Sequence, residues 1–350
     1  MANILHISRT MDIGGAEKIV YQLATDLKEE FDNVHVASTG GLWEEELNKN
    51  GIKHHKILDV ESKSPKTLAV NFNTLRKIIK EHKIDIIHTH HRMAAFYARL
   101  LMYIFPKIKH IYTAHNIFDN KIKMYKYSLK GAKVIAVGEG VSRHLKKDLS
   151  VDSSIIYNAI HESNDKSTVK EIKERTEIKI GFIGRLSEQK GLSYLIDAIK
   201  LIEKENIHIF IAGDGDLKDK LLIQVKALEV DDKITFLGYR EDTTAIINSC
   251  DFMVMPSLYE GLPLTLIEYF QNGKTVVGTT IPGIQEVVTH EVSGLLVKPG
   301  DALSLSKEIQ RLGIDVNLRS KLEEQTKKVY GEKFSYNNFI SKYSKIYQEK

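Results

Sequence analysis

The chain has little of what holds secreted or membrane proteins together. It contains one cysteine, Cys250, in 350 residues, which excludes an internal disulfide and a thiolate zinc cluster. No run comes near the roughly 18 uncharged apolar residues of a spanning helix, and the start, MANILHISRTMDIGG, lacks the pattern of a signal peptide. We therefore expect a cytoplasmic protein. Cys250, in an apolar run, is expected to be a packing residue.

Composition and charge are those of a globular protein with one basic region. Hydrophobic residues make up 42% and charged residues 27%, and the length suggests two domains of about 150 residues each. The net charge is only +4, but residues 76–147 hold sixteen basic and four acidic side chains. Such a field suits a nucleic acid, a phospholipid surface or a pyrophosphate-linked substrate. A solvated, lysine-rich face is the alternative.

Short apolar runs alternate with amphipathic stretches along the whole chain, which predicts parallel sheets covered by helices. The predicted strands are residues 3–8, 34–38, 54–58, 85–89, 110–114, 134–137 and 154–157, then 179–183, 207–212, 233–237, 252–255, 275–278 and 294–297. The polar residues 161–177 form the expected linker region. The predicted fold class is therefore α/β, with two doubly wound, Rossmann-like domains (1–165 and 166–334) facing a central cleft. A C-terminal helix (335–350) would cap the fold, and packing back on the first domain is one arrangement open to it.

Glycines follow several of these strands. In open parallel sheets, ligands bind beyond the carboxyl ends of the strands, where helix N-termini favour phosphate. Gly14 and Gly15 follow the first strand, Gly184 follows the strand at 179–183, and Gly213 opens the turn GDGD. The GDGD turn is weak evidence for a ligand site, because such turns are common in α/β folds.

The segment PSLYEGLPLTLIEYFQNG carries two carboxylates, Glu260 and Glu268. A helix that begins near Pro263 would aim the amides of residues 261–265 at a ligand, between the two acids. This arrangement suits a nucleotide diphosphate sugar, with amides on the phosphates and carboxylates on the hydroxyls. A solvated helix face is the alternative for Glu268.

Two cations, Arg185 and Lys190, lie in GFIGRLSEQKG between a strand and a helix. At that place they can neutralise a pyrophosphate without a metal. The segment that carries them holds no acidic D-x-D pair. On their own the two cations are weak evidence for a diphosphate site. The presence of Glu260 and Glu268 strengthens that interpretation.

Histidines end two predicted strands of the first half. Strand alternation puts His88 and His90 on one face and His91 on the other, and no nearby carboxylate completes a ligand set, so we expect no metal there. His115, in TAHN, is expected to be a hydrogen-bond donor or an acid near the reacting centre. A structural histidine is the alternative.

Taken together, these motifs resemble the GT-B glycosyltransferases, and within them the retaining enzymes of glycosyltransferase family 4. The resemblance covers nearly the whole chain and rests on GGAE, THH, TAHN, VIAVGEGVSRHL, IYNAI, GRLSEQKG, IAGDG, FLGYRED, EGLPLTLIE and EVSGLLVKPGD. The motifs are specific for the family but not for one sugar or acceptor. One departure is His161, which stands where an Asp usually follows IYNAI.

The resemblance implies roles for individual residues. Glu268 would bind the donor ribose, Glu260 the donor sugar, and Arg185 with Lys190 the diphosphate. The implied catalytic residues are His115, Arg185, Lys190 and Glu260. The implied donor-binding residues are Gly14, Gly15, Gly184, Arg185, Lys190, Gly213, Glu260, Gly261, Leu262, Leu264, Thr265 and Glu268.

The implied reaction is a retaining sugar transfer from a nucleotide diphosphate sugar, with UDP the commonest carrier, in bacterial cell-surface polysaccharide synthesis. It needs no cofactor and no metal. Front-face substitution and double displacement through an enzyme nucleophile both stay open. A nucleotide-sugar epimerase and a nucleic-acid binding module are the alternative functions, although the basic half lacks the pattern of common nucleic-acid readers.

The acceptor is expected to be a saccharide or a lipid-linked saccharide, bound by the first domain. Residues 92–130 mix apolar and basic side chains, as does a protein surface that lies on an anionic bilayer. The enzyme would then work at the inner face of the cell membrane. The alternative is a helix at 93–104 buried against the sheet. The apolar residues concerned are Phe96, Leu100, Leu101, Tyr103, Ile104 and Phe105.

Overall fold

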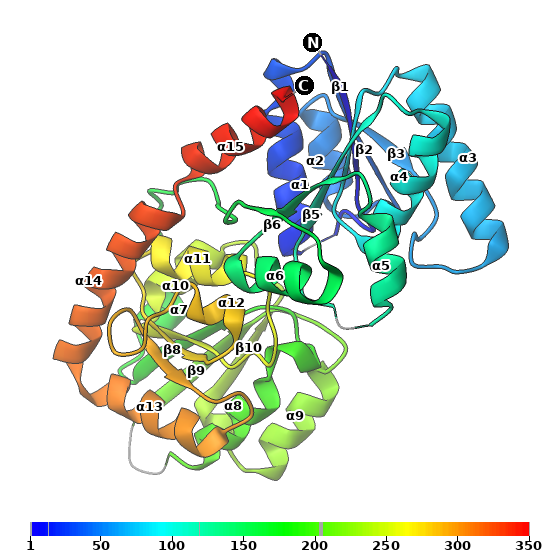
Figure 1. Ribbon diagram of the computed structural model, residues 1–350. Helices are drawn as coiled ribbons and strands as arrows, with labels where there is room; N and C mark the ends of the chain where they lie inside the picture. Colours follow the sequence, from blue (N-terminus) through cyan, green and yellow to red (C-terminus); the bar gives the residue numbers. More distant parts are fainter. Residues whose placement is uncertain (1, 13, 119, 203–205, 350) are drawn as a thin grey trace. The chain divides into compact units, whose positions relative to one another are not determined.

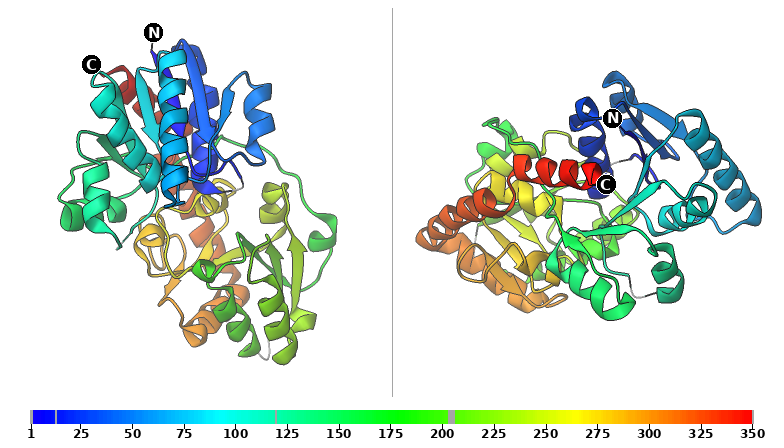
Figure 2. Two further views of the ribbon diagram at one scale, coloured as in Figure 1. Left: turned by 90° about the vertical axis from the view of Figure 1, so that its right-hand side faces the viewer. Right: turned by 45° about the horizontal axis from the view of Figure 1, so that its top comes forward.

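The computed structural model describes residues 2–12, 14–118, 120–202 and 206–349 and divides the chain into two compact units (Figure 1). Residues 1–158 and 337–350 form the first unit, and residues 159–336 form the second. Each unit is an α/β structure with helices beside a parallel sheet (Figure 2). None of the described helices is both long and apolar enough to span a bilayer.

The first unit contains a seven-stranded sheet of order β3-β2-β1-β4-β5-β6-β7, in which all neighbouring strands are parallel. Its elements are β1 (Asn3–Ile7), α1 (Gly15–Asp26), η1 (Lys28–Glu30), β2 (Asn33–Ser38), α2 (Trp43–Lys49), β3 (Lys53–Lys56), α3 (Pro65–Glu81), β4 (Ile86–Thr89), α4 (Arg92–Ile104), β5 (Lys109–Ala114), α5 (Ile122–Ser128), β6 (Lys133–Ala136), α6 (Glu139–His144), η2 (Leu145–Leu149) and β7 (Ser154–Ile155).

One core of the first unit lies between its sheet and the helices α3 and α4. Strand residues two apart, such as Leu5 and Ile7, point to the same face and are fully buried there. The helices contribute one apolar stripe each, for example Leu75 and Ile79 from α3. Parallel strands covered on both faces explain why the sequence reads as continuous apolar runs.

The last helix, α15 (Tyr336–Gln348), completes the first unit, and its end lies beside the N-terminal strand and helix (Figure 1). Tyr347 Oη lies 2.6 Å from His88 Nδ1, and Tyr343 Oη lies 3.1 Å from Thr113 Oγ1. Both tyrosines are buried. Phe339 and Ile346 are buried with them, on the apolar face that the sequence pattern indicates.

The second unit contains a six-stranded parallel sheet of order β10-β9-β8-β11-β12-β13. Its elements are α7 (Lys170–Lys173), β8 (Ile178–Ile183), η3 (Glu188–Lys190), α8 (Leu192–Lys200), β9 (Ile207–Ala212), α9 (Lys218–Ala227), η4 (Asp231–Lys233), β10 (Ile234–Gly238), α10 (Thr243–Ser249), β11 (Phe252–Met255), α11 (Leu264–Gln271), β12 (Val276–Thr279), α12 (Pro282–Gln285), β13 (Leu295–Val297), α13 (Ala302–Ile314) and α14 (Val316–Lys333).

The core of the second unit packs α8, α13 and part of α9 onto the sheet. Cys250 is 2% exposed, and burial raises the pKa of its thiol to about 12. The thiol therefore stays protonated and packs as a small apolar group, as the sequence predicts. The predicted α/β class, with two Rossmann-like parallel sheets, is confirmed.

The strand orders locate where each sheet binds ligands. In the first sheet the chain moves outward from β1 to β3 and then crosses to β4, and in the second it moves from β8 to β10 and then crosses to β11. Ligands of such sheets bind beyond the carboxyl ends of the strands at this crossing point. The relevant loops therefore follow β1 and β4 in the first unit, and β8 and β11 in the second.

Candidate active site

In the second unit, the loops after β8 and β11 join through a partly buried ion pair. Lys190 Nζ lies 2.5 Å from Glu260 Oε1, and the two side chains are 16% and 8% exposed. Lys190 ends the short helix η3 after β8, and Glu260 lies in the loop between β11 and α11. Two residues that the sequence predicts to act on a donor therefore meet at the crossing point of this sheet.

Further hydrogen bonds hold the Glu260 carboxylate. Ser257 Oγ donates to Oε1 over 3.1 Å, and Gln189 Nε2 donates to Oε2 over 3.1 Å. Gln189 Nε2 also donates to the carbonyl of Tyr259. With both carboxylate oxygens engaged, Glu260 is fixed in place. Lys190 has three N–H groups, so it can donate to a bound anion while it keeps its bond to Glu260.

Two glycines permit these loops to approach closely. Gly191 has φ +65°, and a Cβ there would lie 2.1 Å from the carbonyl oxygen of Pro256. Gly213 has φ +144°, and its Cβ would lie 1.9 Å from the carbonyl oxygen of Gly184. Any side chain would push the loops apart. The predicted glycines at 184 and 213 thus touch each other, while Gly191 was not among the predicted site residues.

Helix α11 begins at Leu264, directly after Pro263, as the sequence predicts. The Ile183 N–H at the end of β8 donates to Tyr269 Oη over 3.1 Å, which ties α11 to that strand. The backbone just before the helix packs closely against Gly283, because a Cβ at Gly283 would lie 2.1 Å from the Gly261 carbonyl oxygen. The first amides of a helix have no acceptor one turn back, so they favour an anion.

The remaining donor residues of this unit differ in exposure. Leu262 and Leu264 are 5% and 7% exposed, so they support the loop more than they offer side chains to a ligand. Thr265 and Glu268 are half-buried on α11, and Arg185 is exposed after β8. The exposed guanidinium of Arg185 is therefore accessible to an anionic ligand, at the same sheet edge as Lys190.

In the first unit, Gly14 and Gly15 form the start of α1 after β1. The Gly14 carbonyl accepts from the N–H of Lys18 over 3.0 Å, which closes the first helical turn. Gly14 has an extended backbone. A Cβ at Gly14 would meet the Glu17 carboxylate at 2.2 Å. The Glu17 carboxylate therefore lies over this helix start, at the crossing point of this sheet.

His115 follows β5 and belongs to a buried row of histidines. Its Nε2 lies 3.1 Å from His90 Nδ1, and His90 Nε2 lies 3.2 Å from His6 Nδ1. Burial lowers the pKa of His115 to about 4. The ring is therefore neutral near pH 7, which favours the hydrogen-bonding role over the acid role for this residue.

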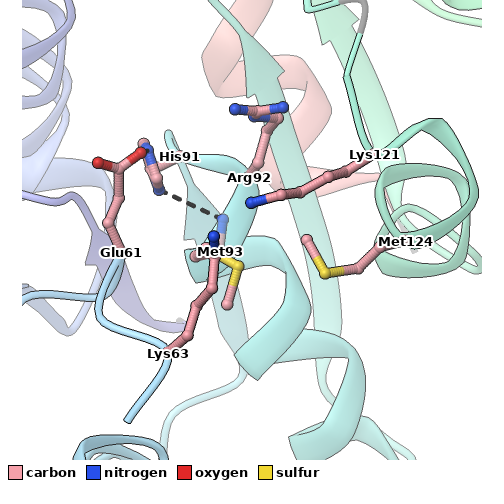
Figure 3. Close-up of a pocket in the computed structure, with 7 residues that line it drawn as sticks. All are labelled: Glu61, Lys63, His91, Arg92, Met93, Lys121 and Met124. Carbon is pink, nitrogen blue, oxygen red and sulfur yellow. Dashed lines mark hydrogen bonds and ion pairs between the residues drawn. The ribbon is translucent and has the colours of Figure 1, made fainter.

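A pocket of about 130 Å³ opens beside the start of α4 in the first unit (Figure 3). Sequence reasoning missed it because its residues come from three separate loops and helices. The lining residues are Glu61, Lys63, His91, Arg92, Met93, Lys121 and Met124. The ammonium groups of Lys63 and Lys121 extend toward the same space (Figure 3). The Arg92 guanidinium points away from them (Figure 3) and donates to Asn120 Oδ1 over 2.7 Å.

The electrostatics of this pocket favour an anion. The contact with Lys63 lowers the pKa of the Lys121 ammonium, with smaller contributions from desolvation and from Arg92. A bound anion would reduce the electrostatic repulsion between such closely spaced cations. Opposite them, His91 Nε2 lies 3.3 Å from Glu61, while His91 Nδ1 accepts from the Met93 N–H. Glu61 also pairs with Arg9, so its charge is already compensated.

The apolar residues expected on one membrane-facing surface separate into two groups. Leu101 is fully buried on α4, so for this residue the expectation of an exposed face was wrong and the alternative of a core helix applies. Tyr103 and Ile104, at the end of the same helix, are 62% and 45% exposed. Arg99 stacks on Tyr103, with its guanidinium carbon 4.6 Å from the ring centroid. A small apolar surface beside cations therefore remains at that end of α4.

Two family models match successive parts of the chain. The model "Glycosyltransferase Family 4" matches residues 13–164, and the model "Glycosyl transferases group 1" matches residues 163–329. The chain belongs to this family of glycosyltransferases, and the resemblance predicted from its motifs is confirmed.

Individual relatives agree with this assignment. The chain is 26% identical over 93% of both chains to a GalNAc-alpha-(1->4)-GalNAc-alpha-(1->3)-diNAcBac-PP-undecaprenol alpha-1,4-N-acetyl-D-galactosaminyltransferase of Campylobacter jejuni. It is 27% identical to a UDP-Gal:alpha-D-GlcNAc-diphosphoundecaprenol alpha-1,3-galactosyltransferase of Escherichia coli, over 71% of this chain and 72% of that one. Among solved structures, HepE of Anabaena, in complex with UDP and glucose, superimposes with a TM-score of 0.88 at 19% identity over the whole of both chains. This last likeness shows the GT-B fold.

Proposed function

We propose that the protein is a retaining, metal-independent glycosyltransferase that moves a sugar from a UDP-sugar to a lipid-diphosphate-linked saccharide. The observation that carries the donor half is the Lys190–Glu260 pair at the crossing point of the second sheet, beside Arg185 and the start of α11. It offers cations for a diphosphate and a fixed carboxylate for sugar hydroxyls. The solved relative that holds UDP and glucose supports the choice of donor.

In the proposed reaction, the bond between the anomeric carbon and the diphosphate breaks while the acceptor oxygen attacks from the same face. The acceptor hydroxyl gives its proton to the departing diphosphate oxygen. Arg185 and Lys190 stabilise the charge that grows on the diphosphate, a contribution of preorganised electrostatics. Glu260 orients the sugar by accepting from its hydroxyls.

The acceptor half of the proposal rests on the basic pocket of the first unit. Lys63, Arg92 and Lys121 are among the residues that line a space of about 130 Å³, and a diphosphate-linked saccharide would present an anion to the ammonium groups of the two lysines. Two relatives named for acceptors on undecaprenol diphosphate support this chemistry. The reaction would serve bacterial cell-surface polysaccharide synthesis at the inner face of the membrane.

A transfer assay tests this function together with its independence from metals. The full chain is incubated with a panel of UDP-sugars and undecaprenyl-diphosphate-linked N-acetylglucosamine, with and without excess EDTA. We expect product from one UDP-sugar and the same turnover in EDTA, because cations and helix amides replace a metal at the diphosphate. A complete loss of turnover that magnesium or manganese restores would contradict metal independence. Conversion of the UDP-sugar without acceptor would instead identify an epimerase.

A second prediction concerns docking on the membrane through the exposed end of α4. The full chain should co-sediment with phosphatidylglycerol vesicles at low salt and dissociate as salt rises, because basic side chains near an anionic surface contribute about 1 kcal/mol each. The variant Y103S/I104S should bind at least about tenfold more weakly, since it loses apolar area that would enter the bilayer.

The control for this experiment is I223S, which removes an equally exposed apolar side chain from α9 of the second unit. It should bind vesicles as the unaltered protein does. No vesicle binding at low salt, or equal weakening by I223S, would reject docking through α4 and favour an acceptor free in solution.

A further inference from the structure

Three histidines of the first unit gather away from the residues described so far. His35 lies on β2, His55 on β3, and His82 directly after α3. Their ring centroids are 4.4 to 5.1 Å apart, and one ring nitrogen of each lies within 4.8 Å of the others. The closest pair is His35 Nδ1 and His55 Nε2, at 3.1 Å.

The topology of the sheet places this cluster on one face of the sheet, at its β3 edge. His35 pairs with Lys53, the first residue of β3, and His55 pairs with Ala37. His35 and Ala37 are two residues apart, so they point to one face. Helix α3 runs back along that face and ends at Glu81, which brings His82 to the two strand histidines. The residues proposed to act on the donor belong to the second unit.

The spacing of the ring nitrogens fits a metal ion. A histidine nitrogen binds zinc at about 2.0–2.1 Å, so two ligands of a tetrahedral ion lie about 3.3 Å apart. The observed 3.1 Å between His35 and His55 needs only a small adjustment. We propose that His35, His55 and His82 bind one late first-row divalent cation, with Zn²⁺ the natural choice, and that water completes the coordination.

The environment of His35 supports this assignment. The residue is 5% exposed, and within the described part of the chain no hydrogen bond satisfies its Nε2 atom. Burial lowers the pKa of His35 and of His55 to about 4, with the neighbouring imidazoles and Lys53 adding to the shift. Both rings are therefore neutral near pH 7, the form that binds metals, and neutral imidazole suits zinc, copper and nickel.

A second histidine cluster in the same unit, His6 with His88 and His90, suits a metal less well. There, His88 already uses both ring nitrogens, 2.6 Å from Tyr347 Oη and 2.8 Å from Thr113 Oγ1. A metal would have to break a buried hydrogen bond to bind His88. In the cluster of His35, His55 and His82, the hydrogen bond that an ion would replace joins His55 Nε2 to His35 Nδ1, two of the proposed ligands themselves. The half-exposed rings of His55 and His82 can also be reached from solvent.

The ion would stabilise an edge of the sheet without joining in sugar transfer. The strand β3 has four residues and pairs only with β2 in the described sheet. An ion held by His35, His55 and His82 would connect this edge strand to its neighbour and to the end of α3. Binding to the folded state alone raises stability in proportion to the logarithm of ligand concentration over Kd. The ion would change the stability of the fold, whereas the turnover proposed above needs no metal.

The test uses the full chain without a histidine tag, after treatment with a chelator. Zn²⁺ affinity is measured by competition with a fluorescent zinc chelator, and Co²⁺ is added to a second sample because tetrahedral cobalt absorbs strongly in the visible. We expect one ion per chain and a tetrahedral cobalt spectrum. H55Q and H82Q should each bind zinc at least about 100-fold more weakly, since even supporting residues of metal sites contribute 10–100-fold.

H54Q is the matched control, because His54 neighbours His55 on the same strand but bonds Ser38 and Glu44 instead. It should bind zinc as the unaltered protein does and keep the rise in melting temperature that zinc gives. Circular dichroism verifies that each variant is folded. If H55Q does not fold, H82Q alone tests the site. Absence of zinc binding in the unaltered protein would overturn the proposal. The proposal would also be overturned if H55Q and H82Q bound zinc as tightly as the unaltered protein does, or if only H90Q lost zinc binding.

Discussion

Replacing Arg185 by alanine is expected to lower kcat of sugar transfer by about 10²–10³-fold, the usual loss when one preorganised charge-stabilising group is removed. Arg185 is exposed after β8, so its removal should leave the fold intact. Affinity for uridine should stay unchanged, while affinity for UDP should fall, because the guanidinium acts on the diphosphate. Steady-state kinetics and calorimetry with uridine and UDP measure the two effects.

K190A should lower kcat to a similar extent but also lower the melting temperature. Its loss would leave the 8% exposed Glu260 carboxylate without its cation, and a largely desolvated carboxylate that loses its partner destabilises the folded state. The control is K200A, which removes an exposed cation at the end of α8. Unchanged turnover in R185A, or equal losses for uridine and UDP, would contradict the diphosphate role.

Replacing Glu268 by alanine is expected to weaken UDP binding by about 10- to 150-fold, which corresponds to the roughly 1.5–3 kcal/mol of hydrogen bonds to a charged group. The carboxylate lies half-buried on α11, whose position is fixed by the Ile183–Tyr269 hydrogen bond. The neighbours therefore keep their places in the variant. Calorimetric titration of UDP into the folded variant measures the loss.

A nucleotide that lacks the ribose 2′-hydroxyl makes this second test specific for the contact between Glu268 and the ribose. The unaltered protein should bind 2′-deoxy-UDP more weakly than UDP, whereas E268A should bind the two alike, since the partner of the hydroxyl is gone. E324A, which removes an exposed carboxylate from α14, should behave as the unaltered protein does. A variant E268A that still prefers UDP over the deoxy form would place the ribose elsewhere.

Local patterns were enough to predict most of the fold. Buried parallel strands are continuous apolar runs, so the strands at 207–212 and 252–255 were predicted with the bounds that the structure gives to β9 and β11. Proline at the start of α11 marked that helix in advance. The predicted division of the chain put the last helix in a segment of its own and left open that it packs back on the first domain; residues 337–350 belong to the first unit.

The parts that sequence reasoning missed depend on residues far apart in the chain. Glu61, Arg92 and Lys121 line one pocket although each lies in a different loop or helix. His35, His55 and His82 likewise meet only because β2 pairs with β3 and α3 returns along the sheet. No local spacing marks such groups. The predicted roles of Glu260 and Lys190 came from their motifs and from the family resemblance, and their direct pairing followed from neither.

The place of α15 bears on how the protein is made on the ribosome. The first unit is discontinuous, since residues 337–350 complete what residues 1–158 begin. While the chain is being synthesised, His88 and Thr113 lack the hydroxyls of Tyr347 and Tyr343 until the last residues emerge. The first unit to begin synthesis is therefore the last to be completed. A nascent chain carries it unfinished while the whole second unit is translated, a period in which exposed apolar surface invites chaperones.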